Sequence, residues 1–364
     1  MKQMHKSAHS KPRIWDRDRT GAFRELLLAW YRTHRRPLPW RRRPTPFRVW
    51  ISEIMLQQTR VQAAIPYYDR FLKRFPDVAA LASASEREIL KYWAGLGYYR
   101  RAHRLGRAAR MIAREFGGKF PSTLADIRRL PGVGRYTAGA IYSIAFQGPE
   151  AIVDANVRRI IRRLHGLPQA TDGFCQGRAD ALLARENPGA FNQAMMELGA
   201  LICLPSMPRC SECPVRSLCR TGRAGKLPAR RRRAAAETES LEIVLVLPEC
   251  GGRMAVMKQA SGGFIPGDWG FPWKAVAPGR RPRAVAEELA LEYLGFVPRL
   301  QTRPTVRHAI TYRRIVAHVF RAALDASQRP NPASGNLTWR VRAAIEGLLT
   351  SSLFRKAAGC RPRQ

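Results

Sequence analysis

Hydrophobic residues recur at helical spacing through roughly the first two hundred residues of the chain. In 23–30 and again in 157–164, apolar side chains follow one another at intervals of three or four positions, which is the pattern of an amphipathic helix. Similar periodicity predicts helices over 102–116 and 136–146, and another that begins near Val49 after two prolines. Because strand-like alternation is scarce here, we predict an all-α domain.

The pattern changes after Cys219. Glycines, a proline and four successive arginines at 230–233 are typical of a linker. Beyond it the alternation predicts three strands and two helices, namely strands at 241–247 (LEIVLVL), 253–258 (RMAVMK) and 315–320, and helices at 283–294 and 341–349. This second domain is therefore predicted to be a smaller α+β domain.

The chain is thus expected to be a multidomain protein. In order, we predict a basic flexible tail (1–19), the all-α domain (20–222), a linker (223–239), the α+β domain (240–352) and a second basic tail (353–364). No run of 18 apolar residues is present, and the charged N-terminus lacks the apolar segment of a secretory signal. We expect a cytoplasmic protein that does not act at a membrane.

The charge of the chain points to a polyanionic partner. Lys and Arg number 64 against 27 Asp and Glu, which gives a net charge of +37, and residues 1–233 carry +28 of it. A folded protein this basic binds nucleic acid or, less commonly, an anionic membrane surface. The concentration of charge in the helical part predicts that the nucleic-acid contacts lie there.

Four of the seven cysteines lie within 17 residues, in the spacing Cys203-x6-Cys210-x2-Cys213-x5-Cys219. An odd number of cysteines grouped in this way does not resemble the disulfide framework of a secreted protein. Four thiolates at close spacing suit zinc or an iron–sulfur cluster, and the wide gaps favour a [4Fe–4S] cluster. On spacing alone zinc and chance grouping stay open.

Two glycine-rich turns have features of nucleic-acid contacts. In the turn 130–134 (LPGVG), Gly132 and Gly134 permit positive φ and a close approach of the backbone, and the helix that follows would present its free N–H groups to a phosphate. In the turn 95–99 (GLGYY), Leu96 or a tyrosine such as Tyr98 could wedge into a base stack. Ordinary helix–helix connections are the alternative for both.

Two carboxylates are candidates for catalysis. Glu53 lies in an apolar helical segment, where burial raises the pKa of a carboxyl group as a general acid requires. Asp154 precedes the helix at 157–164, where it could serve as a simple N-cap or as an ionised catalytic group. Gln58 and Thr59, just after the Glu53 segment, carry groups suited to base edges, although Glu53 could also be the polar edge of an ordinary helix.

Together these segments resemble the helix-hairpin-helix DNA glycosylases, and most closely the MutY-type adenine-DNA glycosylases. The matching segments are 38–40 (LPW), 52–59 (SEIMLQQT), 95–99, 130–134, 154–157 (DANV), 191–199 (FNQAMMELG) and the four-cysteine pattern. Residues 269–272 (WGFP) and 307–308 resemble the MutT-like domain of that family more weakly. The resemblance implies a bilobal helical domain, with the hairpin in one lobe and a [4Fe–4S] loop at 203–219 in the other.

The resemblance also implies an activity, the hydrolytic removal of adenine mispaired with 8-oxoguanine or guanine in double-stranded DNA. Glu53 matches the family's general acid, and Asp154 the carboxylate that stabilises the positively charged sugar. Tyr136 and Asn156 match positions that support this site. Arg36, Arg41 and Glu197 match positions that line the adenine pocket, and Gln58 and Tyr98 match residues that probe the opposite base. We expect a monomer that leaves an abasic site.

Three departures from the related patterns refine this expectation. A lysine nucleophile in the endonuclease III group is replaced by Tyr136, which predicts a monofunctional glycosylase without strand cleavage. Ala155 stands where the family usually has glycine, and it should be tolerated if its φ is negative. The loop that reads 8-oxoguanine aligns with Thr311 and Tyr312, so the sequence does not choose between 8-oxoguanine and guanine.

Two other functions compete with this interpretation. A helix-hairpin-helix glycosylase of different base choice, such as a thymine-mismatch enzyme, would share the first domain, but the presence of the second domain argues against it. A catalytically silent iron–sulfur protein that binds DNA would share the charge and the cysteines, but the presence of both Glu53 and Asp154 argues against it.

Overall fold

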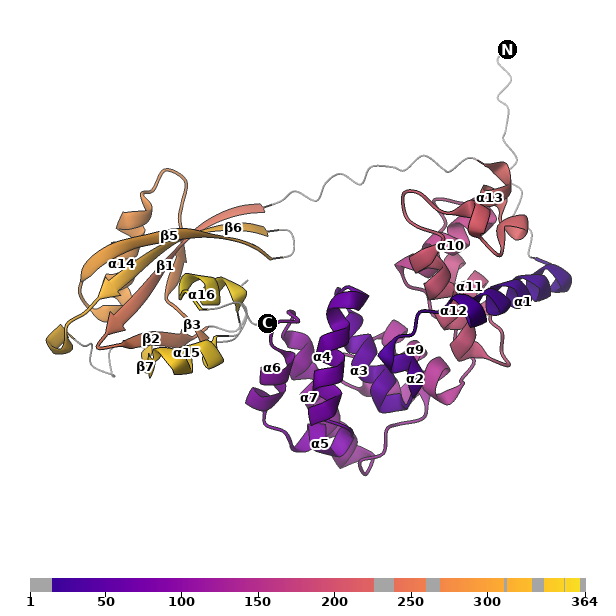
Figure 1. Cartoon of the computed structure of the whole chain (residues 1–364), viewed down its shortest axis with the longest axis horizontal. Helices are drawn as coiled ribbons and strands as arrows, with labels where there is room; N and C mark the ends of the chain where they lie inside the picture. Colours follow the sequence, from indigo (N-terminus) through magenta and orange to yellow (C-terminus); the bar gives the residue numbers. More distant parts are fainter. Residues whose placement is uncertain are drawn as a thin grey trace, which may run out of the picture. The chain divides into compact units, whose positions relative to one another are not determined.

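The computed structural model of the chain describes residues 15–225, 239–259, 269–310, 313–328, 337–349 and 351–360. They form two compact units, one helical and one built on a β-sheet, and each is described by itself (Figure 1). Within the described ranges, no helix is both long and apolar enough to cross a membrane.

The helical unit has two lobes (Figure 1). The first contains α2 (Pro39–Arg42), α3 (Pro46–Leu56), α4 (Val61–Arg74), α5 (Val78–Ser83), α6 (Glu86–Trp93), α7 (Arg100–Glu115), α8 (Leu124–Arg129) and α9 (Arg135–Phe146). The second contains α1 (Arg17–His34), α10 (Ala155–His165), α11 (Asp172–Leu182), α12 (Pro188–Leu201) and α13 (Arg220–Ala224). The bilobal all-α prediction is confirmed, and α1 returns to pack on α12 in the lobe made mostly from the later residues.

Packing explains why these lobes form. In the second lobe, Phe23 and Leu27 of α1 are fully buried against Ile161 of α10 and Phe191 of α12. In the first, Trp50 of α3 is inaccessible to solvent. Burying side chains of this size contributes on the order of 2–3 kcal/mol each before conformational entropy is subtracted. Helix α9 packs on α3 in its own lobe and on α12 in the other, so the two lobes meet along it.

The second unit is a mixed sheet between two layers of helices. Its strands are β1 (Glu239–Cys250), β2 (Arg253–Lys258), β3 (Trp269–Gly270), β4 (Trp273–Ala275), β5 (Arg299–Ile310), β6 (Arg313–Ala323) and β7 (Leu337–Val341). The order β3-β2-β1-β6-β5 makes β1 and β6 a central parallel pair, in register from Glu239↔Arg313 onward, while the other pairs are antiparallel.

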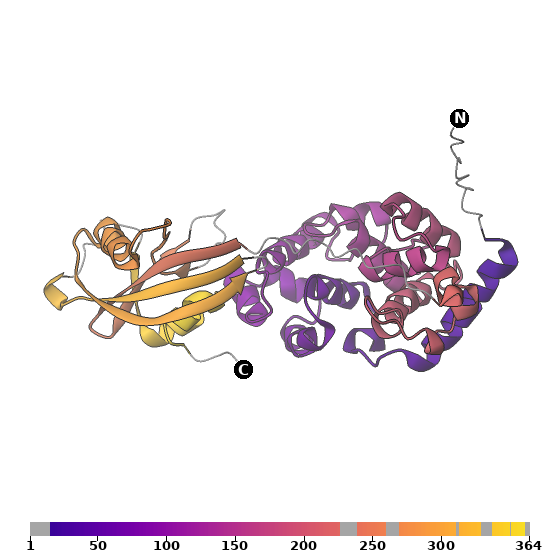
Figure 2. The same ribbon diagram turned by 90° about the horizontal axis from the view of Figure 1, so that it is seen from above.

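Alternation along β1 divides the core of this unit into two. Ile243 and Leu245 face one cluster with α15 (Arg342–Leu348) and α16 (Ser352–Ala357), while Val244 and Val246 face α14 (Pro282–Leu294) on the other side. Figure 2 shows these helices on opposite faces of the sheet. The α+β prediction is confirmed.

The sequence pattern missed strands β3, β4, β5 and β7 and helix α16 of this unit. Strand β5 lies at an edge of the sheet and is largely exposed, so it lacks the alternation that identifies a half-buried strand. Helix α16 lies inside the stretch predicted as a basic tail, but Leu353 and Phe354 are buried in the core. Helix α1 similarly begins at Arg17, before the predicted boundary at residue 20.

Candidate active site

Glu53 lies on α3 with only 8% of its surface exposed, among buried residues on both sides in the sequence. The pKa of its carboxyl group is raised to about 7, mainly by burial and also by the nearby charge of Asp154, while hydrogen bonding by Tyr136 and the charge of Arg41 act in the opposite direction. The group is therefore poised to hold and release a proton near neutral pH, as a general acid must.

Tyr136, in the first turn of α9, belongs to the same site. Burial raises the pKa of its phenol well above the ordinary value, and the charges of Glu53 and Asp154 raise it further, so the group stays neutral and can donate a hydrogen bond. Its hydroxyl donates to the Sδ atom of Met196 on α12, at 3.1 Å. The structure thus brings Glu53, Tyr136 and Asp154 together although they are far apart in the sequence.

Asp154 is the N-cap of α10. One carboxylate oxygen accepts a hydrogen bond from the N–H of Val157 at 2.7 Å, and the other accepts from the Asn156 amide at 2.9 Å. These bonds hold the orientation of the carboxylate at the helix N-terminus. The predicted cap is confirmed, and because Ala155 begins a regular helix and has no positive φ, alanine is tolerated there.

A hydrogen-bonded chain leads from Asp154 toward the cysteine-rich loop. Asn156 accepts a bond from the Arg159 guanidinium at 2.9 Å, and Arg159 also donates to the carbonyl oxygens of Gly199 (2.8 Å) and Cys203 (2.7 Å). A Cβ atom on Gly199 would lie 2.5 Å from the Cβ of Asn156, so glycine is required for this close approach. Sequence reasoning missed Arg159, whose neighbours on α10 are also arginines.

Glu197 on α12 is fully buried and binds two arginines. Arg36 donates to it from the backbone N–H (2.8 Å), Nε (2.9 Å) and Nη2 (2.8 Å), and Arg41 donates through Nη1 (3.1 Å) and Nη2 (3.0 Å). Burial alone would raise the pKa of this carboxyl group, but the bonds from Arg36 and Arg41 lower it to about 2. The predicted trio therefore forms one ion-pair cluster, and Arg41 links it electrostatically to Glu53.

Gln58 and Thr59 form a turn at the end of α3, where Gln58 adopts a left-handed conformation with φ 59°. Arg101 of α7 holds this turn. Its Nη1 atom donates to the carbonyl oxygens of Ile54 (2.8 Å), Met55 (2.8 Å) and Gln57 (2.7 Å), and Nη2 donates to Thr59 Oγ1 (3.2 Å). Sequence reasoning missed Arg101, which occupies the apolar stripe of α7 and is 9% exposed.

The two wedge candidates of the second turn differ in accessibility. Leu96 is 8% exposed, whereas Tyr98 is 45% exposed and has φ 50°. Both Gly95 and Gly97 also have positive φ, and the Trp93 indole N–H donates to the carbonyl oxygen of Gly97 at 3.1 Å. The Tyr98 side chain is therefore partly exposed, while that of Leu96 is buried.

The predicted hairpin joins α8 to α9. Gly132 has φ 85°, as expected, but Gly134 is extended with φ −88° and serves as the N-cap of α9, so the expectation of positive φ was wrong there. No side chain caps α9 at this end, which leaves its first N–H groups available for an anion.

Cys203, Cys210, Cys213 and Cys219 line a single small cavity in the second lobe. The Sγ atom of Cys203 accepts a bond from Arg163 at 3.2 Å, and that of Cys219 accepts one from the N–H of Gly222 at 3.3 Å. Cationic and N–H donors of this kind stabilise metal-bound thiolates, so the donor set fits a thiolate-ligated group. As positioned, no three His, Cys, Asp or Glu side chains within the described ranges form a metal-binding cluster.

The structure thus brings most of the predicted residues into two groups, one around Glu53 and one at the cysteine cavity. Thr311 and Tyr312, the residues expected to read the opposite base, lie outside the described residues.

Comparisons with known proteins place the chain in a family. Residues 51–174 match the model of the HhH-GPD superfamily of base excision DNA repair proteins. Adenine DNA glycosylase of Mus musculus is 36% identical over 383 aligned positions, which cover 87% of this chain and 74% of that protein. The Homo sapiens protein of the same name is 48% identical, covering 55% of this chain and 39% of its own length.

A solved thermostable thymine-DNA glycosylase is also similar, with 30% identity and a TM-score of 0.54. The match spans 98% of that protein but only 57% of this chain. The alignment to the mouse protein covers more than the helical unit alone can supply, and so extends into the α+β unit. The chain belongs to the adenine DNA glycosylase family of the HhH-GPD superfamily and is a monofunctional DNA glycosylase that hydrolyses N-glycosyl bonds.

Proposed function

We propose that this enzyme excises adenine mispaired with 8-oxoguanine or guanine in double-stranded DNA and leaves an abasic site. The observation that carries the proposal is the buried Glu53 carboxyl group, with a pKa of about 7, in the same site as Asp154. Two carboxyl groups in different surroundings suit glycosidic cleavage, in which one protonates the leaving group and the other faces the developing positive charge on the sugar.

The reaction begins when the adenine nucleotide leaves the duplex and enters the protein, since the glycosidic bond is inaccessible inside stacked DNA. Glu53, protonated, donates to N7 of adenine and makes the base a better leaving group. Asp154, held by Val157 and Asn156, faces the oxocarbenium-like sugar and directs water to it. Tyr136 keeps its hydroxyl proton and orients the site rather than attacking the sugar.

Other predicted residues are assigned supporting roles. The cluster of Arg36, Arg41 and Glu197 forms one side of the adenine pocket, with Arg41 also acting on the charge of Glu53. Gln58 and Tyr98, both in left-handed turns, are proposed to contact the opposite base and the vacated stack. Gly132 and Gly134 present the N-terminus of α9 to a DNA phosphate.

The four cysteines are proposed to hold a [4Fe–4S] cluster. Cys203, Cys210, Cys213 and Cys219 would ligate its irons, and the cluster would fix the loop that carries the Arg159 contact to Cys203. The purified protein should be brown and contain about four irons per chain, whereas one zinc per chain and no colour would refute this assignment.

We also propose that the enzyme acts as a monomer on chromosomal DNA in the cytoplasm, which sizing by light scattering and fluorescence imaging of a tagged chain can check.

Base choice is tested with four duplexes that carry adenine opposite 8-oxoguanine, guanine, cytosine or thymine. We expect rapid single-turnover excision opposite 8-oxoguanine and guanine, and a slow reaction opposite the other two. Equal rates opposite 8-oxoguanine and guanine would show that Thr311 and Tyr312 do not read the lesion. Faster release of thymine from a G·T duplex than of adenine from any duplex would favour the thymine-mismatch alternative.

A further inference from the structure

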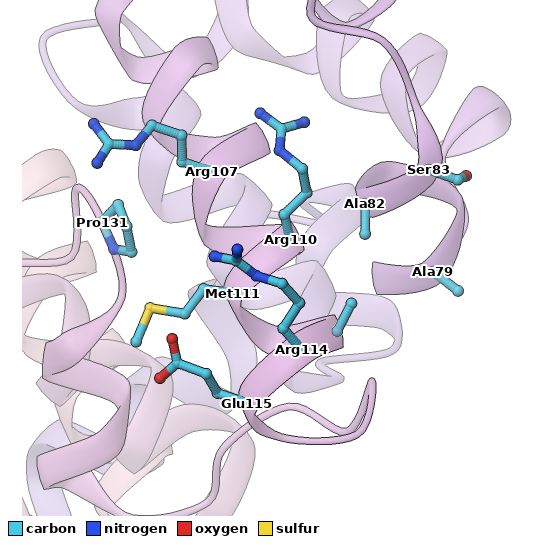
Figure 3. Close-up of a pocket in the computed structure, with 10 residues that line it drawn as sticks. Ala79, Ala82, Ser83, Arg107, Arg110, Met111, Arg114, Glu115 and Pro131 are labelled. Atoms are coloured by element: carbon cyan, nitrogen blue, oxygen red, sulfur yellow. The ribbon is translucent and has the colours of Figure 1, made fainter.

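A pocket of about 610 Å³ lies between α5, α7 and the hairpin turn, apart from the catalytic residues. Its lining includes three arginines of α7, namely Arg107, Arg110 and Arg114, and Pro131 of the hairpin. Figure 3 shows the three arginine side chains extending from α7, with Arg107 directed toward Pro131. We call this pocket the α7 groove.

The α7 groove is strongly cationic. Helix α7 carries six arginines in 16 residues against one acid, Glu115. Glu115 is also the only acid among the ten described residues that line the groove, and its carboxylate pairs with Arg129 at 2.8 Å. Arg107 and Arg114 are exposed, so their charges are available to a ligand. A site of this kind selects a ligand that carries several negative charges.

The groove is continuous with the hairpin, which carries the proposed phosphate site. Pro131 belongs to both, and a Cβ atom on Gly132 would lie only 3.0 Å from the Cβ of Arg104, so the hairpin turn packs directly on α7. From Arg104 to Arg114 the helix rises about 15 Å, which corresponds to about four base pairs at 3.4 Å per step. Small side chains on the α5 wall, Ala79, Ala82 and Ser83, leave room for a bulky backbone.

We propose that the α7 groove binds the phosphate backbone of double-stranded DNA beyond the hairpin, and so holds undamaged and mismatched duplexes alike. Charge complementarity and the continuity with the hairpin favour DNA over an acidic protein segment. Guanidinium contacts to phosphates fix position and carry no base information, so the groove would contribute to affinity and to sliding along DNA rather than to base choice.

The test uses the full chain with Arg107→Gln, Arg110→Gln and Arg114→Gln combined. The control combines Arg17→Gln, Arg185→Gln and Arg253→Gln, which remove the same charge from exposed positions elsewhere. Binding to a fully matched 30-base-pair duplex is measured between about 50 and 200 mM salt. Each lost phosphate contact should make the negative slope of log affinity against log salt less steep by about 0.9. If the contact contributes nothing at 1 M salt, its loss weakens binding about eightfold at 0.1 M salt.

Ethylation interference locates the contacts. For the wild type and the control, we expect ethylated phosphates within about four base pairs of the hairpin contact to reduce binding, and this group of phosphates should become insensitive in the groove variant. An unchanged interference pattern, or equal losses in the groove and control variants, would overturn the proposal. The proposal would also be overturned if the groove variant lost binding to polyglutamate but kept its binding to DNA. Because the duplex contains no mispair, the result is independent of whether adenine is excised.

Discussion

The proton on Glu53 makes the rate of base excision depend on pH in a defined direction. Its pKa of about 7 lies about 2.5 units above the ordinary value of 4.5, so ionising the carboxyl group costs about 3 kcal/mol more in the folded protein than in water. Below pH 7 the group is mostly protonated and ready to donate. We predict a plateau at low pH and a tenfold fall per unit above pH 7, or about 100-fold at pH 9.

Tyr136→Phe tests whether the fall in rate above pH 7, the falling limb of the pH profile, reflects ionisation of Glu53. The Tyr136 hydrogen bond lowers the pKa of Glu53, so its removal should raise that pKa and move the falling limb to higher pH, even if the plateau rate drops. The assay is single-turnover excision with enzyme in excess over an A·8-oxoG duplex, so that product release does not enter the rate. A limb that stays in place, or moves to lower pH, would refute the assignment.

The same raised pKa also predicts how the free energy of unfolding depends on pH, which can be measured without substrate. Because the folded-state pKa is raised, Glu53 contributes almost no penalty below about pH 4.5, and its penalty grows between pH 4.5 and about 7 and is constant above that. Glu53→Gln should therefore gain stability relative to the wild type between pH 5 and 8, by up to about 3 kcal/mol in urea unfolding. A difference in unfolding free energy that does not change with pH would contradict the value.

Three further substitutions test the contacts around the site. Glu197→Gln leaves two guanidinium groups with a neutral partner and should lower the free energy of unfolding by about 3 kcal/mol at pH 7. The loss should be smaller toward pH 2, where the wild-type carboxylate becomes protonated, and an equal loss at both pH values would argue against the ion-pair cluster. Arg159→Met should slow excision about 10- to 100-fold and increase the loss of iron on dilution, and both can be measured in one preparation. Wild-type values for both would show that the hydrogen bonds from Arg159 to Asn156 and Cys203 contribute neither to catalysis nor to cluster retention. Arg101→Met should cost about 3 kcal/mol in urea unfolding and Arg101→Lys less, because the lysine ammonium group retains donors for the carbonyls of Ile54, Met55 and Gln57; identical losses would mean that packing alone is involved.

Much of the helical unit could be predicted because its helices bury one face, and burial imposes a period that the sequence displays. The stripe from Val157 to Leu164 is one example, since its apolar members are almost fully buried. Strand β5 was missed for the converse reason. An edge strand that buries little has no period to display, and its stability comes from hydrogen bonds to β6, which no local pattern records.

The chemistry of the site divides in the same way. Glu53 stood out because a carboxylate inside an apolar segment is unusual, and Asp154 because a helix start is recognisable. Their proximity to Tyr136 is a property of the packing of α3, α9 and α10, which sequence spacing does not encode. Arg101 carried a detectable signal, a charge on the apolar stripe of α7, whereas the contacts of Arg159 become visible only in three dimensions.

The central claim, that Glu53 drives hydrolytic loss of adenine, is tested most directly by measuring the free base. The wild type and Glu53→Gln are incubated with an A·8-oxoG duplex, and adenine is quantified by chromatography beside a gel assay for strand breaks and borohydride trapping. We expect stoichiometric adenine from the wild type, none from Glu53→Gln under the same conditions, and neither breaks nor a trapped adduct. Adenine release that survives the substitution, or a stoichiometric trapped adduct with the wild type, would contradict the account.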